Sequence, residues 1–262
     1  NDKVFDVNEV VTLSLTYKNI WLAGSNVSLR LSSTDPDIEI VQDSLYVGSL
    51  SAYTTYNTTP TATFRVKAKS TCPFDKNITF SLRTSNNVFV DNVTANFTVT
   101  FRQGWATHNA NNMKLSLTKD GAVGKKTQLY GSGLNMPGYT GSQIFEGGLM
   151  IGTSNTKVSD DCRRGTVPAN VSDTDFTALS SYIMQSPGVN SNEDGRGYFN
   201  DDGAGVNKVG VTVRSESFAW SNAADANYII LRYTIKNTSG SNISNMFTGM
   251  YMYYTPNGVN SN

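Results

Sequence analysis

The chain has 262 residues, of which 38% are hydrophobic and 11% aromatic, so it can form one large domain or two domains of ordinary size. Charged residues make up only 16%, below the usual quarter, and the polar surface must come from Ser, Thr, Asn and Gly, a balance typical of extracellular β-proteins. The 21 basic and 21 acidic residues cancel, which removes the electrostatic drive for binding nucleic acid. No run of about 18 apolar residues occurs, so no membrane span is predicted.

Residues 10–101 repeat one pattern, in which short stretches of alternating apolar and polar residues are separated by polar turns. Alternation with a period of two places the apolar side chains on one face of a strand. About seven such strands, the first running continuously through residues 11–17, indicate an immunoglobulin-like β-sandwich over residues 1–102. The residues expected in its core are Leu13, Leu15, Leu29, Leu31, Phe64, Val66, Phe80, Leu82 and Val99.

A polar stretch at residues 103–112 interrupts this pattern and predicts a linker. Strand patterns resume after it, among them separate short strands at 209–213 and 217–220 and a long strand at Tyr228–Lys236. We therefore expect residues 113–262 to form a second, less regular β-rich domain, a jelly-roll-like sandwich truncated at its C-terminus. The chain opens without a methionine or a signal peptide, so we expect it to be a fragment of a longer precursor.

Side chains suited to catalysis are scarce. The single histidine, His108, lies in the predicted linker, where a surface or seam position is expected, and no serine stands in a Gly-x-Ser-x-Gly motif. Carboxylates that could act as a pair are present, but nothing in the sequence places two of them across a cleft. They are Glu146, Glu193, Asp194, Asp201 and Asp202. The sequence therefore predicts a protein that is not an enzyme.

Residues 190–201 carry the most specific local motif. Oxygen-bearing side chains stand at positions one, three and five, glycine at six and a carboxylate at twelve, a spacing that resembles a calcium loop of the EF-hand or dockerin kind. Position one is asparagine, position twelve is aspartate and no helices flank the loop, so a plain hairpin loop is the alternative. The predicted calcium ligands are Asn190, Asn192, Asp194, the Arg196 carbonyl, Asp201 and Asp202.

The two cysteines, Cys72 and Cys162, lie 90 residues apart and could form one disulfide or remain two separate thiols. The sequence contains no cluster of cysteines and histidines, so it predicts no zinc or redox site. Ser44, in Asp43-Ser44-Leu45, fits an acceptor pattern for O-glycans on exported bacterial proteins, and eight Asn-x-Ser/Thr sequons are present.

Tyrosines provide the best argument for a binding surface. Tyr251, Tyr253 and Tyr254 near the end of the chain could stack on sugars or fill an interface. Half-buried packing within a sheet is the alternative.

Several segments resemble a region of large secreted subtilisin-like peptidases and surface proteins of gram-negative bacteria. Val10–Ile38 resembles the immunoglobulin-like modules that follow the catalytic domain in these proteins. Phe145–Ser154, Lys157–Asp160 and Tyr228–Asn237 resemble the β-rich region that comes next. The resemblance implies a secreted precursor that ends in a sorting domain, and because the peptidase domain is not part of this chain, no catalytic residue is carried over. The segment after Phe247 departs from the family, since acidic residues are expected there and none is present.

Together these features predict a non-catalytic structural segment of a secreted or cell-surface protein, one that spaces, stabilises or assembles its parent. Its expected partners are neighbouring domains of the same precursor or other copies of itself. The alternative is a carbohydrate-binding accessory module of a secreted hydrolase, with a polysaccharide as ligand. An exposed row of tyrosines over a groove would favour sugar binding, and an apolar patch or an unpaired strand edge would favour assembly.

Overall fold

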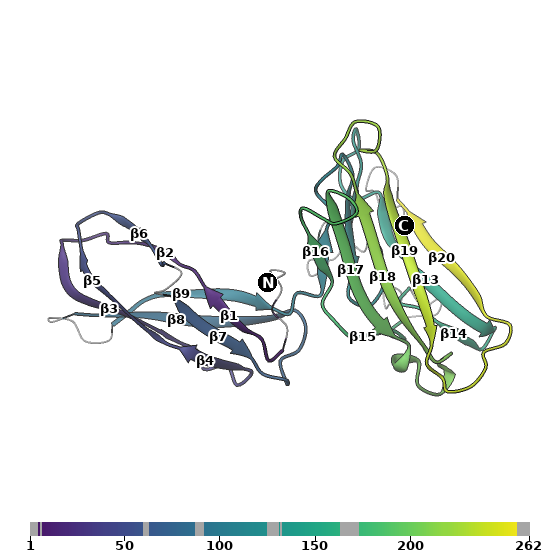
Figure 1. Ribbon diagram of the computed structural model, residues 1–262, viewed down its shortest axis with the longest axis horizontal. Helices are drawn as coiled ribbons and strands as arrows, with labels where there is room; N and C mark the ends of the chain where they lie inside the picture. The colour runs from purple at the N-terminus through teal and green to yellow at the C-terminus, as the bar shows by residue number, and fades with distance from the viewer. Residues whose placement is uncertain are drawn as a thin grey trace. The chain divides into compact units, whose positions relative to one another are not determined.

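The computed structural model describes residues 5, 7–59, 63–86, 92–124, 131, 133–162 and 173–255. Within these residues the chain is an all-β protein whose sheets are antiparallel and open, with one short 3-10 helix (η1, Asp202–Asn207). No helix in this part of the chain is both long and apolar enough to cross a membrane. The chain divides into two compact units, Lys3–Gln103 and Gly104–Asn262 (Figure 1).

The first unit contains three antiparallel sheets, with strand orders β5-β3-β8-β9, β1-β7-β4 and β2-β6. Its strands are β1 (Val10–Leu13), β2 (Thr16–Lys18), β3 (Gly24–Ser32), β4 (Ile38–Gln42), β5 (Ser44–Leu50), β6 (Thr55–Asn57), β7 (Phe64–Ala68), β8 (Lys76–Ser85) and β9 (Asn92–Phe101). The predicted first strand is divided in two, because β1 pairs with β7 whereas β2 pairs with β6. The chain changes sheets between Leu13 and Thr16.

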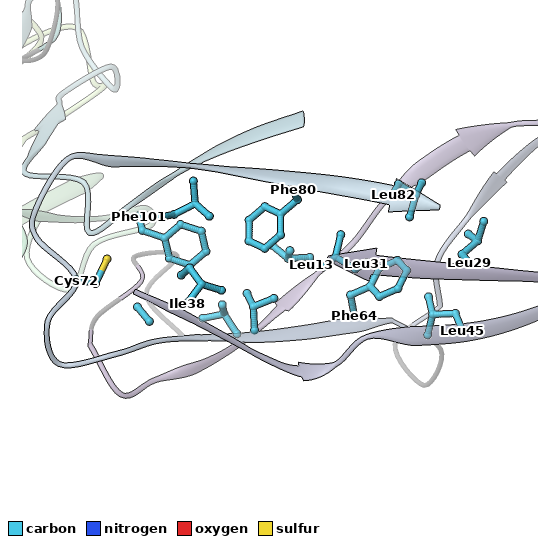
Figure 2. Packing of buried hydrophobic residues seen from close by; sticks show 14 residues of the cluster. Leu13, Leu29, Leu31, Ile38, Leu45, Phe64, Cys72, Phe80, Leu82 and Phe101 are labelled. Carbon is cyan, nitrogen blue, oxygen red and sulfur yellow. The ribbon is translucent and has the colours of Figure 1, made fainter. Parts of the chain in front are cut away.

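The core of the first unit lies between its sheets, as the alternation predicts. Figure 2 shows Phe64 of β7 and Phe80 of β8 pointing into the same interior, and both side chains are fully buried. The predicted core residues are buried except Leu15 and Val99, which are partly buried against the same cluster. Each fully buried apolar side chain of this size stabilises the fold by about 1.5–3 kcal/mol.

The second unit contains three antiparallel sheets, with strand orders β14-β13-β20, β15-β17-β18-β19 and β10-β11-β12, and β16 pairs with β17. Its strands are β10 (Trp105–Thr107), β11 (Lys114–Thr118), β12 (Leu134–Asn135), β13 (Ile144–Ser154), β14 (Lys157–Ser159), β15 (Thr177–Ala178), β16 (Ile183–Gln185), β17 (Glu193–Asn200), β18 (Val211–Ala219), β19 (Ile229–Asn237) and β20 (Phe247–Tyr254). Leu149 and Ile151 of β13 pack against Phe199 of β17 and Val213 of β18, so two of the sheets meet face to face.

Two predictions about the second unit are wrong. The stretch predicted to be a linker begins the unit, since residues 105–107 form β10 and pair with β11. The two strands predicted at 209–213 and 217–220 are one strand, β18, whose hydrogen bonds to β17 and β19 continue through the intervening polar residues. Ser215 and Ser217 are buried in this strand, where an apolar pattern alone would end it.

Candidate functional site

His108 lies at the centre of a buried polar network, not at the surface or seam expected from the sequence. Its Nε2 is 2.6 Å from Ser217 Oγ and its Nδ1 is 3.3 Å from Glu193 Oε2. Because the Glu193 carboxylate can only accept, Nδ1 donates to it, while Nε2 and the Ser217 hydroxyl form the second hydrogen bond of the ring. The hydroxyl of Tyr182, 2.9 Å from Ser217 Oγ, completes the chain of hydrogen bonds.

This serine–histidine–glutamate connectivity resembles that of a hydrolytic triad, but it is enclosed. His108 and Ser217 have no exposed surface and Glu193 is only 8% exposed. A nucleophile must meet a carbonyl carbon, whereas Ser217 Oγ is surrounded by Tyr182, His108 and the backbone of Gly195. In this arrangement the three residues join β17, β18 and the 108–110 turn.

Glu193 is the residue that fixes the 108–110 turn. Its Oε2 accepts hydrogen bonds from the backbone N–H of Asn109 (2.7 Å) and of Ala110 (3.0 Å) as well as from His108. Burial raises the pKa of Glu193, but these hydrogen bonds outweigh burial and hold the pKa below its ordinary value. The carboxylate is therefore charged at neutral pH.

The predicted calcium loop is not a loop, and this prediction is wrong. Residues 193–200 form β17, paired on one side with β16 and β15 and on the other with β18, so the Arg196 carbonyl lies within a sheet. Asp194 and Asp201 are seven residues apart along this extended segment, roughly 23 Å at 3.3 Å per residue. Their carboxylates cannot share one calcium ion, which requires oxygens at about 2.3–2.6 Å.

Each predicted calcium ligand has another hydrogen-bonding role. The Asp194 carboxylate accepts from the backbone N–H groups of residues 189–191 and closes the turn before β17. Asn192 accepts from the N–H of Ser221. Asp201 is 1% exposed and accepts from the N–H groups of residues 209–211, and Asp202 forms an ion pair with Lys208 at 2.8 Å.

The calcium-loop motif predicts a sharp turn at Gly195. In the structure this glycine instead leaves space for the buried side chain of Tyr182. A Cβ at Gly195 would lie 2.2 Å from Ser217 Oγ, and one at Gly197 would lie 2.7 Å from the Tyr182 ring. Both glycines are on the inward face of β17, where they leave room for a fully buried tyrosine. A glycine within a strand often marks such a close approach.

Three other carboxylates do lie close together. Ligand oxygens of Asp160, Asp173 and Asp175 are within 4.8 Å of one another, at a place that the sequence motif did not indicate. Burial, with the neighbouring Asp173 carboxylate, raises the pKa of Asp160 above its ordinary value, although the N–H of Cys162 donates to it at 2.7 Å. Oxygen ligands of this kind suit a hard cation such as calcium.

The predicted disulfide is not present. Cys72 and Cys162 are both free and both buried, Cys72 within the core of the first unit and Cys162 within the second. A disulfide requires two sulfurs about 2.05 Å apart, and each sulfur here is enclosed by its own unit. Burial raises the pKa of both thiols, which makes them poor nucleophiles at neutral pH.

Ser44 has the exposure that a glycan acceptor needs, and its modification stays a prediction. It begins β5 at the surface, while the following Leu45 is buried. Its hydroxyl donates to Asp43 Oδ1 at 2.9 Å, and this bond, with that of Arg30, holds the pKa of Asp43 below its ordinary value.

The three candidate binding tyrosines lie on β20, but they do not form one row. Successive side chains of a strand point to opposite faces, so Tyr251 and Tyr253 share one face and Tyr254 lies on the other. Tyr251 and Tyr253 are 39% and 38% exposed, and the Tyr253 ring packs edge-on against Phe145 with centroids 5.7 Å apart. All three tyrosines are therefore exposed, Tyr254 most at 59%, and packing within the sheet is seen for Tyr253.

The strand β20 is itself the most exposed apolar element of the second unit. In the described part of the chain β13 is the one strand that pairs with it, so β20 is an edge strand of its sheet there. Met250 pairs with the buried Leu149, and residues directly opposite each other in a sheet share a face, so Met250 lies on the core-facing side. Met250 is nevertheless 42% exposed, and Phe247 on the other side is 72% exposed.

The sheet that faces β13 ends at the strand β19. Inward residues of its last strand, β19, pack on the buried clusters that contain β13 and β11 residues; they are Ile229, Leu231, Tyr233 and Ile235. Beyond them only Met252 of β20 reaches this core. On the opposite side of β20 an apolar hollow of about 450 Å³ lies between Met150, Val158 and Phe247.

No protein-family model, curated protein sequence or solved structure matches this chain. The resemblance to the accessory region of secreted subtilisin-like peptidases therefore stays a prediction.

Proposed function

We propose that this chain is a non-catalytic structural segment of a larger extracellular protein and that its second unit associates with a second copy through β20. The observation that carries the proposal is an eight-residue apolar strand, exposed on both faces, that pairs with another strand on one side only within the described residues. Natural proteins protect such edges with charges, prolines or bulges unless the edge pairs with a partner. No charged residue or proline occurs between Phe247 and Tyr254, and the register shift in this ladder lies on β13, between Ile144 and Glu146.

The edge strand β19 of the same unit shows the contrast. It carries Arg232, which is paired with Glu216 of β18, and Lys236, so two copies of β19 would place these basic residues at one seam. The strand β20 has no charged residue, and self-pairing meets no such repulsion. Two copies related by a two-fold axis would pair antiparallel and join their β14-β13-β20 sheets into one continuous sheet.

The arrangement of the tyrosines supports assembly over sugar binding. Tyr251 and Tyr253 share one face, but the Tyr253 ring packs edge-on against Phe145 and Tyr254 lies on the opposite face, so the three tyrosines do not form one carbohydrate platform. The resemblance of Val10–Ile38 supports an immunoglobulin-like first unit, and the low proportion of charged residues supports an extracellular location. The two sheets that meet face to face support a jelly-roll-like second unit.

Analytical ultracentrifugation of the full chain over a concentration series tests the proposal. We expect the wild-type chain to self-associate and the Met250→Lys variant to remain monomeric, because two buried lysines would meet across the new interface. The matched control is Ile230→Lys, which places the same charge on β19 at a residue of similar exposure, 45% against 42%. Near-ultraviolet circular dichroism checks that both variants are folded.

A wild-type chain that stays monomeric up to its solubility limit would overturn the proposal. Equal loss of association in both lysine variants would also overturn it, since it would show that β20 is not the contact.

A further inference from the structure

The first unit contains an apolar cleft of about 710 Å³, within the range of pockets that take small-molecule ligands. One wall is the segment of residues 15–21, which includes β2. The opposite wall is the inner face of the β3-β8-β9 sheet, where the lining side chains include Leu29, Leu82, Ala95 and Phe97. Leu29 and Leu82 are buried, while Ala95 is exposed and Phe97 is half-buried, so the core is open at this edge strand.

The lip of the cleft is a short loop of three large apolar residues held in a defined position. Ile20, Trp21 and Leu22 are 72%, 73% and 71% exposed, and the first two line the cleft. Asn19 holds this loop, because its Oδ1 accepts from the N–H of Trp21 and its Nδ2 donates to the carbonyls of Leu22 and Ser51. Three consecutive exposed apolar side chains on a fastened loop form an apolar surface beside the cleft.

Lys18 is the one charged residue that lines the cleft, and it is exposed, on the face of β2 opposite to the half-buried Tyr17. In the described part of the chain its ammonium group has no ion-pair or hydrogen-bond partner, and no carboxylate lines the cleft that could neutralise it. The cleft thus offers an apolar interior and a single cation among its lining residues. This combination complements a ligand with an apolar body and one anionic end.

We propose that this cleft binds a long-chain fatty acid, with the hydrocarbon chain against Leu29, Leu82 and Phe97 and the carboxylate at Lys18. Trp21 would contact the chain at the lip. The bound ligand would cover the exposed apolar surface at the edge of the core and part of the Ile20–Leu22 loop, and removing this apolar surface from water is favourable. The site is distinct from β20 and does not depend on self-association.

Quenching of tryptophan fluorescence by dibromostearate tests the proposal, since bromine quenches an indole ring only at short range. The protein is the full chain with Trp105→Phe and Trp220→Phe, so that Trp21 is the reporter. We expect saturable quenching below the concentration at which the fatty acid forms micelles. Ala95→Phe, which fills the cleft from an exposed position, should abolish it.

Charge specificity provides the second measurement. Lys18→Gln should weaken stearate binding, measured by competition with dibromostearate, by about tenfold, because a charge-assisted hydrogen bond is lost. Binding of stearyl alcohol should be unchanged in this variant. The matched control is Lys67→Gln on β7, a lysine outside the cleft, which should leave both affinities unchanged.

Three outcomes would overturn the proposal. One is the absence of saturable quenching by the monomeric fatty acid. Another is quenching that persists in Ala95→Phe. The third is binding to anionic phosphatidylglycerol vesicles without any binding of the free acid, which would assign the Ile20–Leu22 loop to a membrane surface instead.

Discussion

Replacement of Glu193 by alanine should destabilise the second unit more than any surface substitution. The change leaves His108 Nδ1, which is fully buried, without an acceptor, and it also removes the acceptor for the N–H groups of Asn109 and Ala110. An unsatisfied buried donor costs about 1–3 kcal/mol. Asn109 is exposed and Ala110 half-buried, so water compensates part of the loss, and we expect about 2–4 kcal/mol in total. This is a large share of the roughly 5–15 kcal/mol that stabilises a domain.

The charge of Glu193 adds a dependence on pH. Because the hydrogen bonds hold its pKa below the ordinary value, the ionised carboxylate contributes stability that is present above the ordinary pKa and lost as the pH falls through the lowered value. Glu193→Gln removes this contribution. The stability difference between wild type and Glu193→Gln should therefore be largest at neutral pH and should narrow in acid.

Urea unfolding followed by tryptophan fluorescence measures both effects. With Trp21→Phe in every variant, the signal comes from Trp105 and Trp220 of the second unit. The control is Asp202→Asn, an exposed carboxylate of the second unit that pairs with Lys208 at 2.8 Å, and it should change stability by less than about 1 kcal/mol. An unchanged unfolding midpoint in Glu193→Ala, or a gap between wild type and Glu193→Gln that stays constant in acid, would refute the reasoning.

Three further predictions concern packing. Phe64→Ala removes a fully buried ring from the core of the first unit and should cost about 3–5 kcal/mol in urea unfolding. Gly124→Ala should lower the free energy of unfolding by about 2–4 kcal/mol, because φ is +67° and the new Cβ would lie 2.1 Å from a methyl group of Ile144. Gly138→Ala, with φ +81° and no atom within 4 Å, should lower it by only about 1 kcal/mol. Equal costs for the two substitutions would contradict this prediction. Cys72 and Cys162 should resist thiol labelling at neutral pH in the native protein and should react in denaturant, and rapid native labelling would show that one sulfur is accessible.

Much of the first unit could be predicted from its sequence because the information is local. Leu29 and Leu31 alternate with polar residues, and alternation alone decides which face of a strand is buried. The sequence could not show that the chain leaves one sheet after Leu13 and joins another at Thr16. That change depends on which strands, β7 and β6, are available to pair.

The sites required the tertiary structure, because each depends on residues far apart in the chain. Gly195 has the spacing of a calcium-loop glycine. Its role is decided instead by Tyr182, which directly precedes β16 and whose ring occupies the space that a side chain at Gly195 would need. His108 looked isolated because Glu193 and Ser217 stand 85 and 109 residues further along. The exposure of Met250 also depends on residues that are far from it in the chain. Its strand is as apolar as a buried one, and its exposure is decided by the tertiary structure, in which β20 is an edge strand within the described residues.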